Sequence, residues 1–263
     1  DGYMDICISS QGTENILLRN DTGKNSGKIK FTDVTKEAGV GLPIKSFPVA
    51  FLDFNNDGWQ DLTIQTYDAE NCDYDNAAEY FNKPVKGEYS ILYKNNGDGT
   101  FTDITKEMNM QVAMTVMGLS FGDLDNDGWM DIYSGTGTPN YTSLVPKRMF
   151  RNNEGKSYQD ITHSGGFGHL QKGHGIGFGD VDNDGDQDVY EDMGGGYEGD
   201  GFQGAFYENP GISGNNWVSL QLVGVKANKS AMGSKVKITV ENADKSTRDI
   251  YVEEGRKMKT LGS

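Results

Sequence analysis

Short apolar runs alternate with turn-forming segments along this chain, and the same order of segments returns several times. An inner apolar run comes first, as in residues 47–52 (FPVAFL), 117–122 (MGLSFG) and 174–179 (HGIGFG). An acidic loop follows, and then a second short apolar segment that begins at Asp5, Asp61, Asp131 or Asp188. Short apolar runs bounded by Gly, Asn and Asp predict β-strands joined by tight turns.

Two further segments complete each repeat. The third segment ends in Asn, at Asn20, Asn95, Asn152 and Asn209, and the fourth begins with an aromatic residue at Phe31, Phe101 or Tyr158. The glycine of the acidic loop recurs at intervals of 56, 70 and 57 residues, at Gly2, Gly58, Gly128 and Gly185. Four short strands per repeat are typical of β-propeller blades, which must stack on their neighbours to bury both sheet faces. The sequence therefore predicts an all-β fold.

Two regions depart from the repeat. Residues 67–89 are an insertion rich in Asp, Asn and Tyr, which we expect to form a surface loop. After residue 214, apolar and polar residues alternate in the segments 217–225 and 235–241, which predicts half-buried strands. We therefore divide the chain into propeller repeats over residues 1–212 and a small β module over residues 213–263.

Composition narrows the class of protein. The 263 residues contain 39 Asp+Glu and 24 Lys+Arg, and the net charge of −15 argues against a nucleic-acid or anionic-membrane surface. No apolar run is long enough to span a membrane. An aromatic content of 11% is unusual for disordered chains. Cys7 and Cys72 are either unpaired thiols or one disulfide between neighbouring repeats.

Three nine-residue acidic loops share the pattern D-x-[DN]-x-D-G-x-x-D, and we call them loop 1 (residues 53–61), loop 2 (residues 123–131) and loop 3 (residues 180–188). Positions 1, 3, 5 and 9 are all Asp or Asn. The candidate metal ligands are Asp53, Asn55, Asp57, Trp59 and Asp61 in loop 1, Asp123, Asp125, Asp127, Trp129 and Asp131 in loop 2, and Asp180, Asp182, Asp184, Asp186 and Asp188 in loop 3. Residues 1–5 match the second half of the same loop, so Asp1, Tyr3 and Asp5 form a fourth, partial site.

This ligand pattern suits calcium, a hard cation that takes six to eight oxygen ligands in flexible geometry. The glycine at position 6 permits a sharp turn, which would bring the carbonyl of position 7 toward the ion. The last carboxylate comes at position 9 and a strand follows, so the loops are not EF-hands. Acidic Asn-Gly turns without an ion are the alternative. We expect the calcium ions to be structural, because several carboxylates within nine residues repel one another without a cation.

The segments FGDLDNDGWMDI (residues 121–132) and FGDVDNDGDQDV (residues 178–189) resemble the FG-GAP/VCBS repeats of integrin-like β-propellers. Residues 215–236 are similar to the start of an ASPIC/UnbV module, as in cartilage acidic protein-like proteins. The resemblance implies a secreted or surface-displayed seven-bladed propeller with calcium in its blade hairpins. The repeats here supply about three and a half blades and a shortened module, so we expect either a fragment or blades supplied from elsewhere.

Two short motifs resemble enzyme signatures without their structural context. Ser120 lies in a G-x-S-x-G sequence, but it aligns with Ala50 and Gly177 of the other repeats and no helical pattern follows it. Gly194, Gly196 and Gly199 fit G-x-G-x-x-G, yet the segment is acidic and opens no helix. No acid–base pair can be assembled from the sequence, so we assign no catalytic residue.

Three functional hypotheses remain open. The first is an extracellular, non-enzymatic calcium-binding propeller that serves as an adhesion or interaction scaffold for a protein or glycan partner. The second is a small-ligand binder or enzyme that uses the glycine-rich face around His174 and residues 194–204. The third is a self-assembling surface protein, because the open edges of an incomplete repeat array must be covered by something.

Overall fold

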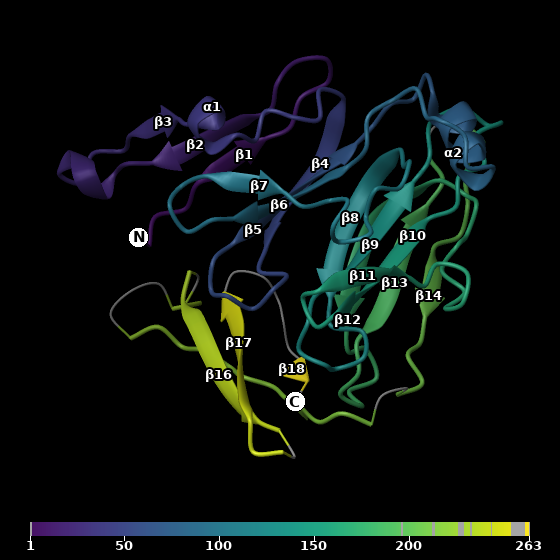
Figure 1. The fold of residues 1–263 in the computed structure, drawn as a ribbon. Coiled ribbons are helices and arrows are strands. Elements are labelled where there is room, and N and C mark those ends of the chain that lie inside the picture. Colours follow the sequence, from purple (N-terminus) through teal and green to yellow (C-terminus); the bar gives the residue numbers. More distant parts are fainter. Residues whose placement is uncertain are drawn as a thin grey trace.

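The computed structural model describes residues 2–195, 197–211, 214–225, 229–231, 233–242, 244–253 and 261–262. Within these residues the fold is all-β and propeller-like, as the sequence predicts, with antiparallel sheets that follow one another along the chain (Figure 1). The described part of the chain contains no helix that is both long and apolar enough to cross a membrane.

Four of the described sheets correspond to the repeats. The first contains β1 (Ile6–Ile8), β2 (Ile16–Asn20) and β3 (Phe31–Asp33). The second contains β4 (Ser46–Leu52), β5 (Asp61–Thr66), β6 (Ile91–Asn95) and β7 (Phe101–Asp103). The third contains β8 (Val116–Gly122), β9 (Asp131–Thr136), β10 (Arg148–Asn153) and β11 (Ser157–Asp160). The fourth contains β12 (Gly173–Gly179), β13 (Asp188–Met193) and β14 (Ala205–Tyr207).

Strand register places the acidic loops at equivalent corners of these sheets. Loop 1 joins Leu52 to its partner Asp61 at the open end of the β4–β5 pair, and loops 2 and 3 occupy the same place between β8 and β9 and between β12 and β13. The first strand of each pair also carries a register shift near its start. Such bulges increase the local twist of a sheet. The repeated sequence thus gives a repeated hairpin geometry.

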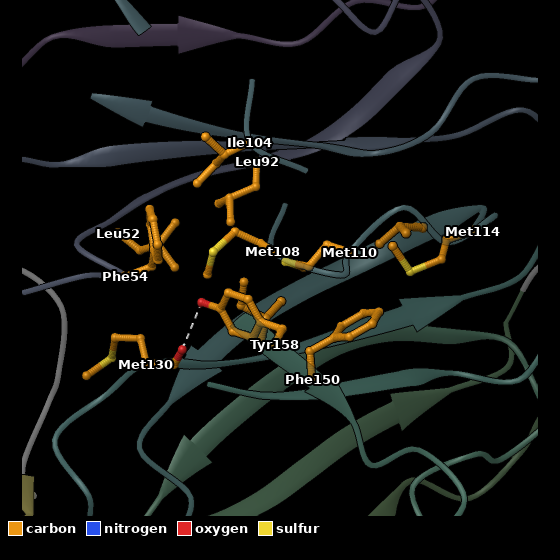
Figure 2. Packing of buried hydrophobic residues seen from close by; sticks show 12 residues of the cluster. Leu52, Phe54, Leu92, Ile104, Met108, Met110, Met114, Met130, Phe150 and Tyr158 are labelled. Atoms are coloured by element: carbon orange, nitrogen blue, oxygen red, sulfur yellow. Dashed lines mark hydrogen bonds between the residues drawn. The ribbon is translucent and has the colours of Figure 1, made fainter. Parts of the chain in front are cut away.

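Apolar side chains fill the space between successive sheets. One cluster joins the first and second sheets, a second joins the second and third, and a third joins the third and fourth. Figure 2 shows the second cluster, where methionines such as Met108 and Met114 lie between Leu92 of β6 and Phe150 of β10. The buried Tyr158 hydroxyl donates a hydrogen bond to the Met130 carbonyl, 3.0 Å away. Unbranched methionine side chains suit such irregular gaps between twisted sheets.

The insertion differs from expectation. It contains the helix α2 (Cys72–Tyr80), whose Cys72 and Ala78 side chains are buried, so the prediction of a surface loop is wrong for this segment. The Asp75 carboxylate accepts hydrogen bonds from the backbone N–H groups of Lys86 and Gly87, at 2.7 and 2.9 Å. These bonds hold the returning chain against the helix. Shorter helical turns, η1 (Gly23–Asn25) and α1 (Thr35–Ala38), occur in the first repeat.

The C-terminal region forms two small antiparallel pairs. The predicted strand over residues 235–241 is confirmed as β16 (Lys235–Glu241), which pairs with β17 (Thr247–Glu253). The predicted strand over residues 217–225 is mostly wrong, because only β15 (Trp217–Val218) is formed, paired with β18 (Leu261–Gly262). No partner strand continues beyond Val218 among the described residues, and Val223 and Val225 are exposed. Cys7 and Cys72 are both unpaired.

Candidate metal centres

The backbone of the three acidic loops follows one conformation. Position 6 has positive φ in each loop, with values of 85°, 84° and 101° at Gly58, Gly128 and Gly185. Position 4 is also left-handed, although it is Asn rather than Gly, at Asn56, Asn126 and Asn183. Asparagine tolerates this region better than most residues. The sharp turn that the glycine predicts is therefore present, and a second left-handed residue helps to form it.

Loop 2 brings three carboxylates together in a buried position. One carboxylate oxygen from each of Asp123, Asp125 and Asp127 lies within 4.8 Å of the others. Asp123 accepts hydrogen bonds from the N–H groups of Asp127 and Gly128, at 2.9 and 2.8 Å. The Oδ1 atom of Asp125 is buried and has no hydrogen-bond partner. A buried oxygen without a partner is costly, and a cation is one way to satisfy it.

A guanidinium group lies beside the same loop. Arg151 contacts the Asp125 carboxylate closely, and its Nη2 atom lies 3.4 Å from Oδ2 of Asp127. The pKa of Asp127 is nevertheless raised to about 6, mainly by burial and then by the charge of Asp125. One arginine therefore does not fully compensate the negative charge of loop 2.

Loop 3 gathers the equivalent carboxylates in a more open setting. Oxygens of Asp180, Asp182 and Asp184 also lie within 4.8 Å of one another, and Asp182 and Asp184 are exposed. The Oδ1 atom of Asp180 is buried without a hydrogen-bond partner. Among the residues that the structure describes, no basic side chain forms an ion pair with this trio.

Loop 1 has the same shape with one carboxylate fewer. Asp53 accepts hydrogen bonds from the N–H groups of Asp57 and Gly58, at 3.1 and 2.8 Å, as Asp123 does in loop 2. Asn55 stands at position 3, and its Nδ2 atom donates to Asp57 over 2.9 Å. Burial raises the pKa of Asp53 to about 6. Amide and carboxylate oxygens both suit calcium, so this loop offers a less negative set of ligands.

The position 9 carboxylates attach each loop to its own sheet. Each accepts two backbone hydrogen bonds, one from position 2 of its loop and one from the Asn at or near the end of the third strand, which is Asn95, Asn152 or Asn209. In loop 2, for example, Asp131 accepts from Leu124 at 2.8 Å and from Asn152 at 2.7 Å, and Asp61 and Asp188 accept in the same way. Burial raises the pKa of Asp61 to about 7. A role for these residues as metal ligands stays a prediction.

The remaining predicted ligands lie where the loop pattern places them. The backbone N–H of position 7 donates to the position 5 carboxylate in every loop, from Trp59, Trp129 and Asp186, at 2.9, 3.0 and 3.0 Å. In the partial loop, Asp5 accepts a 2.7 Å hydrogen bond from the Asn20 N–H, which is the position 9 arrangement. Tyr3 is exposed, and Asp1 lies outside the described residues.

Asparagines that connect successive repeats were not predicted from the sequence. The position 4 side chain of one loop donates to the glycine carbonyl of the next, from Asn56 to Gly128 over 2.9 Å and from Asn126 to Gly185 over 3.1 Å. The third-strand asparagines donate back to the position 2 carbonyl of the preceding loop, from Asn152 to Phe54 and from Asn209 to Leu124, at 2.8 and 2.7 Å. The sequence feature that could have indicated these links is the recurrence of the asparagines at the same places in successive repeats.

The C-terminal strands pack against the loop glycines. Tyr251 of β17 lies against Gly58, and Ile250 and Arg248 lie against Gly128. The Nη2 atom of Arg248 donates a 2.6 Å hydrogen bond to the Asp127 carbonyl. The tail thus contacts the outside of loops 1 and 2, in addition to the contact of Trp217 with Gly185 in loop 3.

The enzyme-like motifs have no catalytic setting among the described residues. Ser120 lies within β8 and is followed by β9 rather than by a helix. Gly194 forms a bridge to Gly201, while Gly196 lies outside the described residues. A fully buried Lys147–Glu191 pair, which was not predicted from the sequence, has its Nζ and Oε1 atoms 3.6 Å apart. Tyr133 donates a 3.1 Å hydrogen bond to Glu191, so the group is a buried polar network between the third and fourth sheets.

Comparison with known proteins agrees with the repeat pattern. Residues 85–134, which include loop 2, match the model of a family described as FG-GAP-like repeat. No curated protein matches the chain. One similar solved structure is that of an Agrocybe aegerita lectin, which is described as recognising non-reducing terminal N-acetylglucosamine. The two chains are 18% identical with a TM-score of 0.36, and the match covers 73% of this chain and 43% of that chain. The likeness of residues 215–236 to an ASPIC/UnbV module stays a prediction.

Proposed function

We propose that this chain is part of a calcium-binding β-propeller that works as an extracellular interaction scaffold. The observation that carries the proposal is loop 2, where three carboxylates converge and the buried Oδ1 of Asp125 has no hydrogen-bond partner. All the candidate donors are oxygens, which calcium prefers. Loop 3 repeats the trio, and loop 1 repeats the fold of the loop.

Calcium at these loops would act on the structure rather than on a reaction. Each ion would neutralise carboxylates that otherwise repel one another, and it would fix a corner from which the two strands of a hairpin leave. Because adjacent loops are joined through Asn56 and Asn126, ordering one loop also supports the next repeat. Such a rigid stack presents loops and blade edges to a protein or glycan partner, in keeping with the FG-GAP-like match.

Calorimetric titration of calcium into metal-free protein, combined with thermal unfolding, tests the proposal. We expect saturable binding and a rise in Tm, because a ligand at a hundredfold excess over its Kd stabilises the folded state by about 2.7 kcal/mol. Asp125→Ala and Asp182→Ala, which remove the position 3 oxygens of loops 2 and 3, should each remove one binding event. Glu70→Gln, at an exposed carboxylate away from the loops, is the matched control and should bind calcium normally.

The absence of both binding heat and a Tm shift in a demonstrably metal-free sample would show that the loops are ordinary Asx-rich turns. If Glu70→Gln also lost one calcium-binding event, calcium binding would depend on the overall negative charge of the protein rather than on the loops.

A further inference from the structure

The C-terminal hairpin, formed by β16 and β17, lies against the outside of loops 1 and 2, at the same end of two successive sheets in the row (Figure 1). Ile250 of β17 is 1% exposed and packs against Gly128 of loop 2. Arg248 donates a 2.6 Å hydrogen bond to the main-chain carbonyl of Asp127. A side-chain carbon at Gly128 would lie 2.6 Å from Cδ1 of Ile250 and 2.8 Å from Nη1 of Arg248. The loop glycine therefore leaves the space in which the hairpin packs.

One asparagine joins both loops to the hairpin. The Nδ2 atom of Asn56 in loop 1 donates to the Gly128 carbonyl over 2.9 Å, and its Oδ1 atom accepts a 3.3 Å hydrogen bond from the Tyr251 N–H. The Tyr251 ring also packs against Gly58. Asn56 is itself a left-handed residue of the turn, with φ of 53°, so the direction of its side chain depends on that turn. Contact with the hairpin thus depends on the conformation of loop 1.

The hairpin contacts fall on the part of each loop that would hold an ion. Arg248 binds the carbonyl of Asp127, whose carboxylate is the position 5 candidate ligand. Gly58 and Gly128 are the position 6 residues, each directly before the position 7 carbonyl. A cation that fixes this turn also fixes the surface on which the hairpin docks. Conversely, the docked hairpin restricts the turn that the cation needs.

The charge of Arg248 is compatible with an occupied loop 2. This loop carries four carboxylates, at positions 1, 3, 5 and 9, and it is contacted by Arg151 and Arg248. Four carboxylates and two guanidinium groups leave two negative charges uncompensated, which one calcium ion would balance. The net charge of the loop therefore gives no reason for the ion to expel the hairpin.

We propose that the C-terminal hairpin is a clamp on loops 1 and 2, and that its docking and calcium binding strengthen each other. This regulation rests on the proposed function, because it acts on the same calcium sites. Coupling between two binding events is reciprocal, so a docked hairpin tightens calcium binding by the factor by which calcium favours docking. Such couplings usually amount to about 5- to 150-fold. In the described part of the chain Trp217, rather than the hairpin, packs against Gly185 of loop 3, which makes loop 3 an internal reference.

Hydrogen–deuterium exchange of the whole chain, with and without calcium, tests the clamp directly. We expect calcium to slow amide exchange in β16 and β17 by at least about fivefold, because a more firmly docked hairpin opens less often. The Tyr251 N–H is the direct reporter, since it bonds to Asn56 of loop 1. Unchanged exchange in the hairpin while calcium binds the loops would overturn the clamp and leave the proposed function intact.

Arg248→Met separates the clamp from a simple charge effect. Removing a positive charge beside loop 2 would by itself tighten calcium binding, whereas losing the contact with Asp127 should weaken it. By calorimetry we expect the Kd of the loop 2 event to rise about fivefold or more, while the loop 3 event, identified by its loss in Asp182→Ala, stays unchanged. Lys245→Met is the matched control, because it removes the same charge from a hairpin residue that pairs with Glu241, and it should bind calcium like the wild type.

Ile250→Ala tests the same docking contact without a change of charge. It should weaken calcium binding and speed exchange in the hairpin, while the strands of the repeats keep their protection. Unchanged or tighter calcium binding in both Arg248→Met and Ile250→Ala would overturn the clamp. A chain that binds no calcium at any loop would overturn the proposed function and the clamp together, so the two failures give different results.

Discussion

Loops 2 and 3 have nearly the same sequence and the same backbone shape, yet they occupy different surroundings. Leu124 at position 2 of loop 2 is 6% exposed, while Val181 at position 2 of loop 3 is 64% exposed. Arg151 of β10 forms ion pairs with two carboxylates of loop 2. Among the described residues, no basic side chain forms an ion pair with the carboxylates of loop 3. The difference arises because the fourth sheet covers loop 2, and no described sheet covers loop 3 in the same way.

This contrast separates what a loop does by itself from what its neighbours add. The turn, the clustered carboxylates and the attachment of position 9 to the sheet occur in both loops. Burial and the asparagine link to the next loop occur in loop 2 and not in loop 3. We therefore expect loop 2 to contribute to folding even without an ion, and loop 3 to depend more strongly on calcium for its order.

Truncation at position 2 should give the largest difference between the two loops. Leu124→Ala removes a buried side chain from the cluster between the third and fourth sheets, and we expect a loss of about 3 kcal/mol in the free energy of unfolding. Val181→Ala removes an exposed side chain and should change it by less than about 0.5 kcal/mol. Denaturant unfolding at low protein concentration measures both. Equal losses would show that Val181 is buried in solution.

The pH dependence of stability should reveal the buried carboxylates in metal-free protein. Burial raises the pKa of Asp53 to about 6 and of Asp61 to about 7, above the ordinary aspartate value of 3.8. The folded state therefore binds protons more tightly than the unfolded state, and these groups reduce stability as pH rises from about 4 to about 7. We expect a loss of several kcal/mol over that range, at most about 7 kcal/mol, since one unit of pKa difference corresponds to about 1.4 kcal/mol.

Thermal unfolding across that range, with and without calcium, measures this effect. Bound calcium favours the ionised carboxylates, so saturating calcium should reverse the slope and make stability rise with pH. The same slope in both conditions would contradict binding at these residues.

Substitution at position 4 should give a smaller effect that isolates the link between loops. Asn126→Ala removes a buried side chain that donates to the Gly185 carbonyl, and we expect it to cost about 1–2 kcal/mol. Asn183→Ala changes an exposed side chain with the same left-handed backbone, so it controls for the conformational cost of alanine there. Chemical denaturation of the pair gives the difference. If Asn183→Ala costs as much, the backbone rather than the inter-loop bond explains the loss.

Much of the fold could be predicted because the same local pattern of strands and turns occurs in each of the repeats. The strands that flank the loops, the third strands β6 and β10, and the hairpin strand β16 follow from short-range alternation. Helix α2 was not predicted, because its polar sequence resembles a loop and its position depends on bonds such as those from Lys86 and Gly87 to Asp75. The region after Val218 was mispredicted, because alternation alone does not supply a partner strand.

By itself the sequence determined the nine-residue loops, their glycine turns and the carboxylates that converge in them, because these features involve residues close together in the chain. Only the tertiary structure decided which loop is buried, which carboxylate lies beside Arg151, and which asparagines join one repeat to the next. Those properties depend on contacts between sheets, and identical repeats meet different neighbours according to their place in the row.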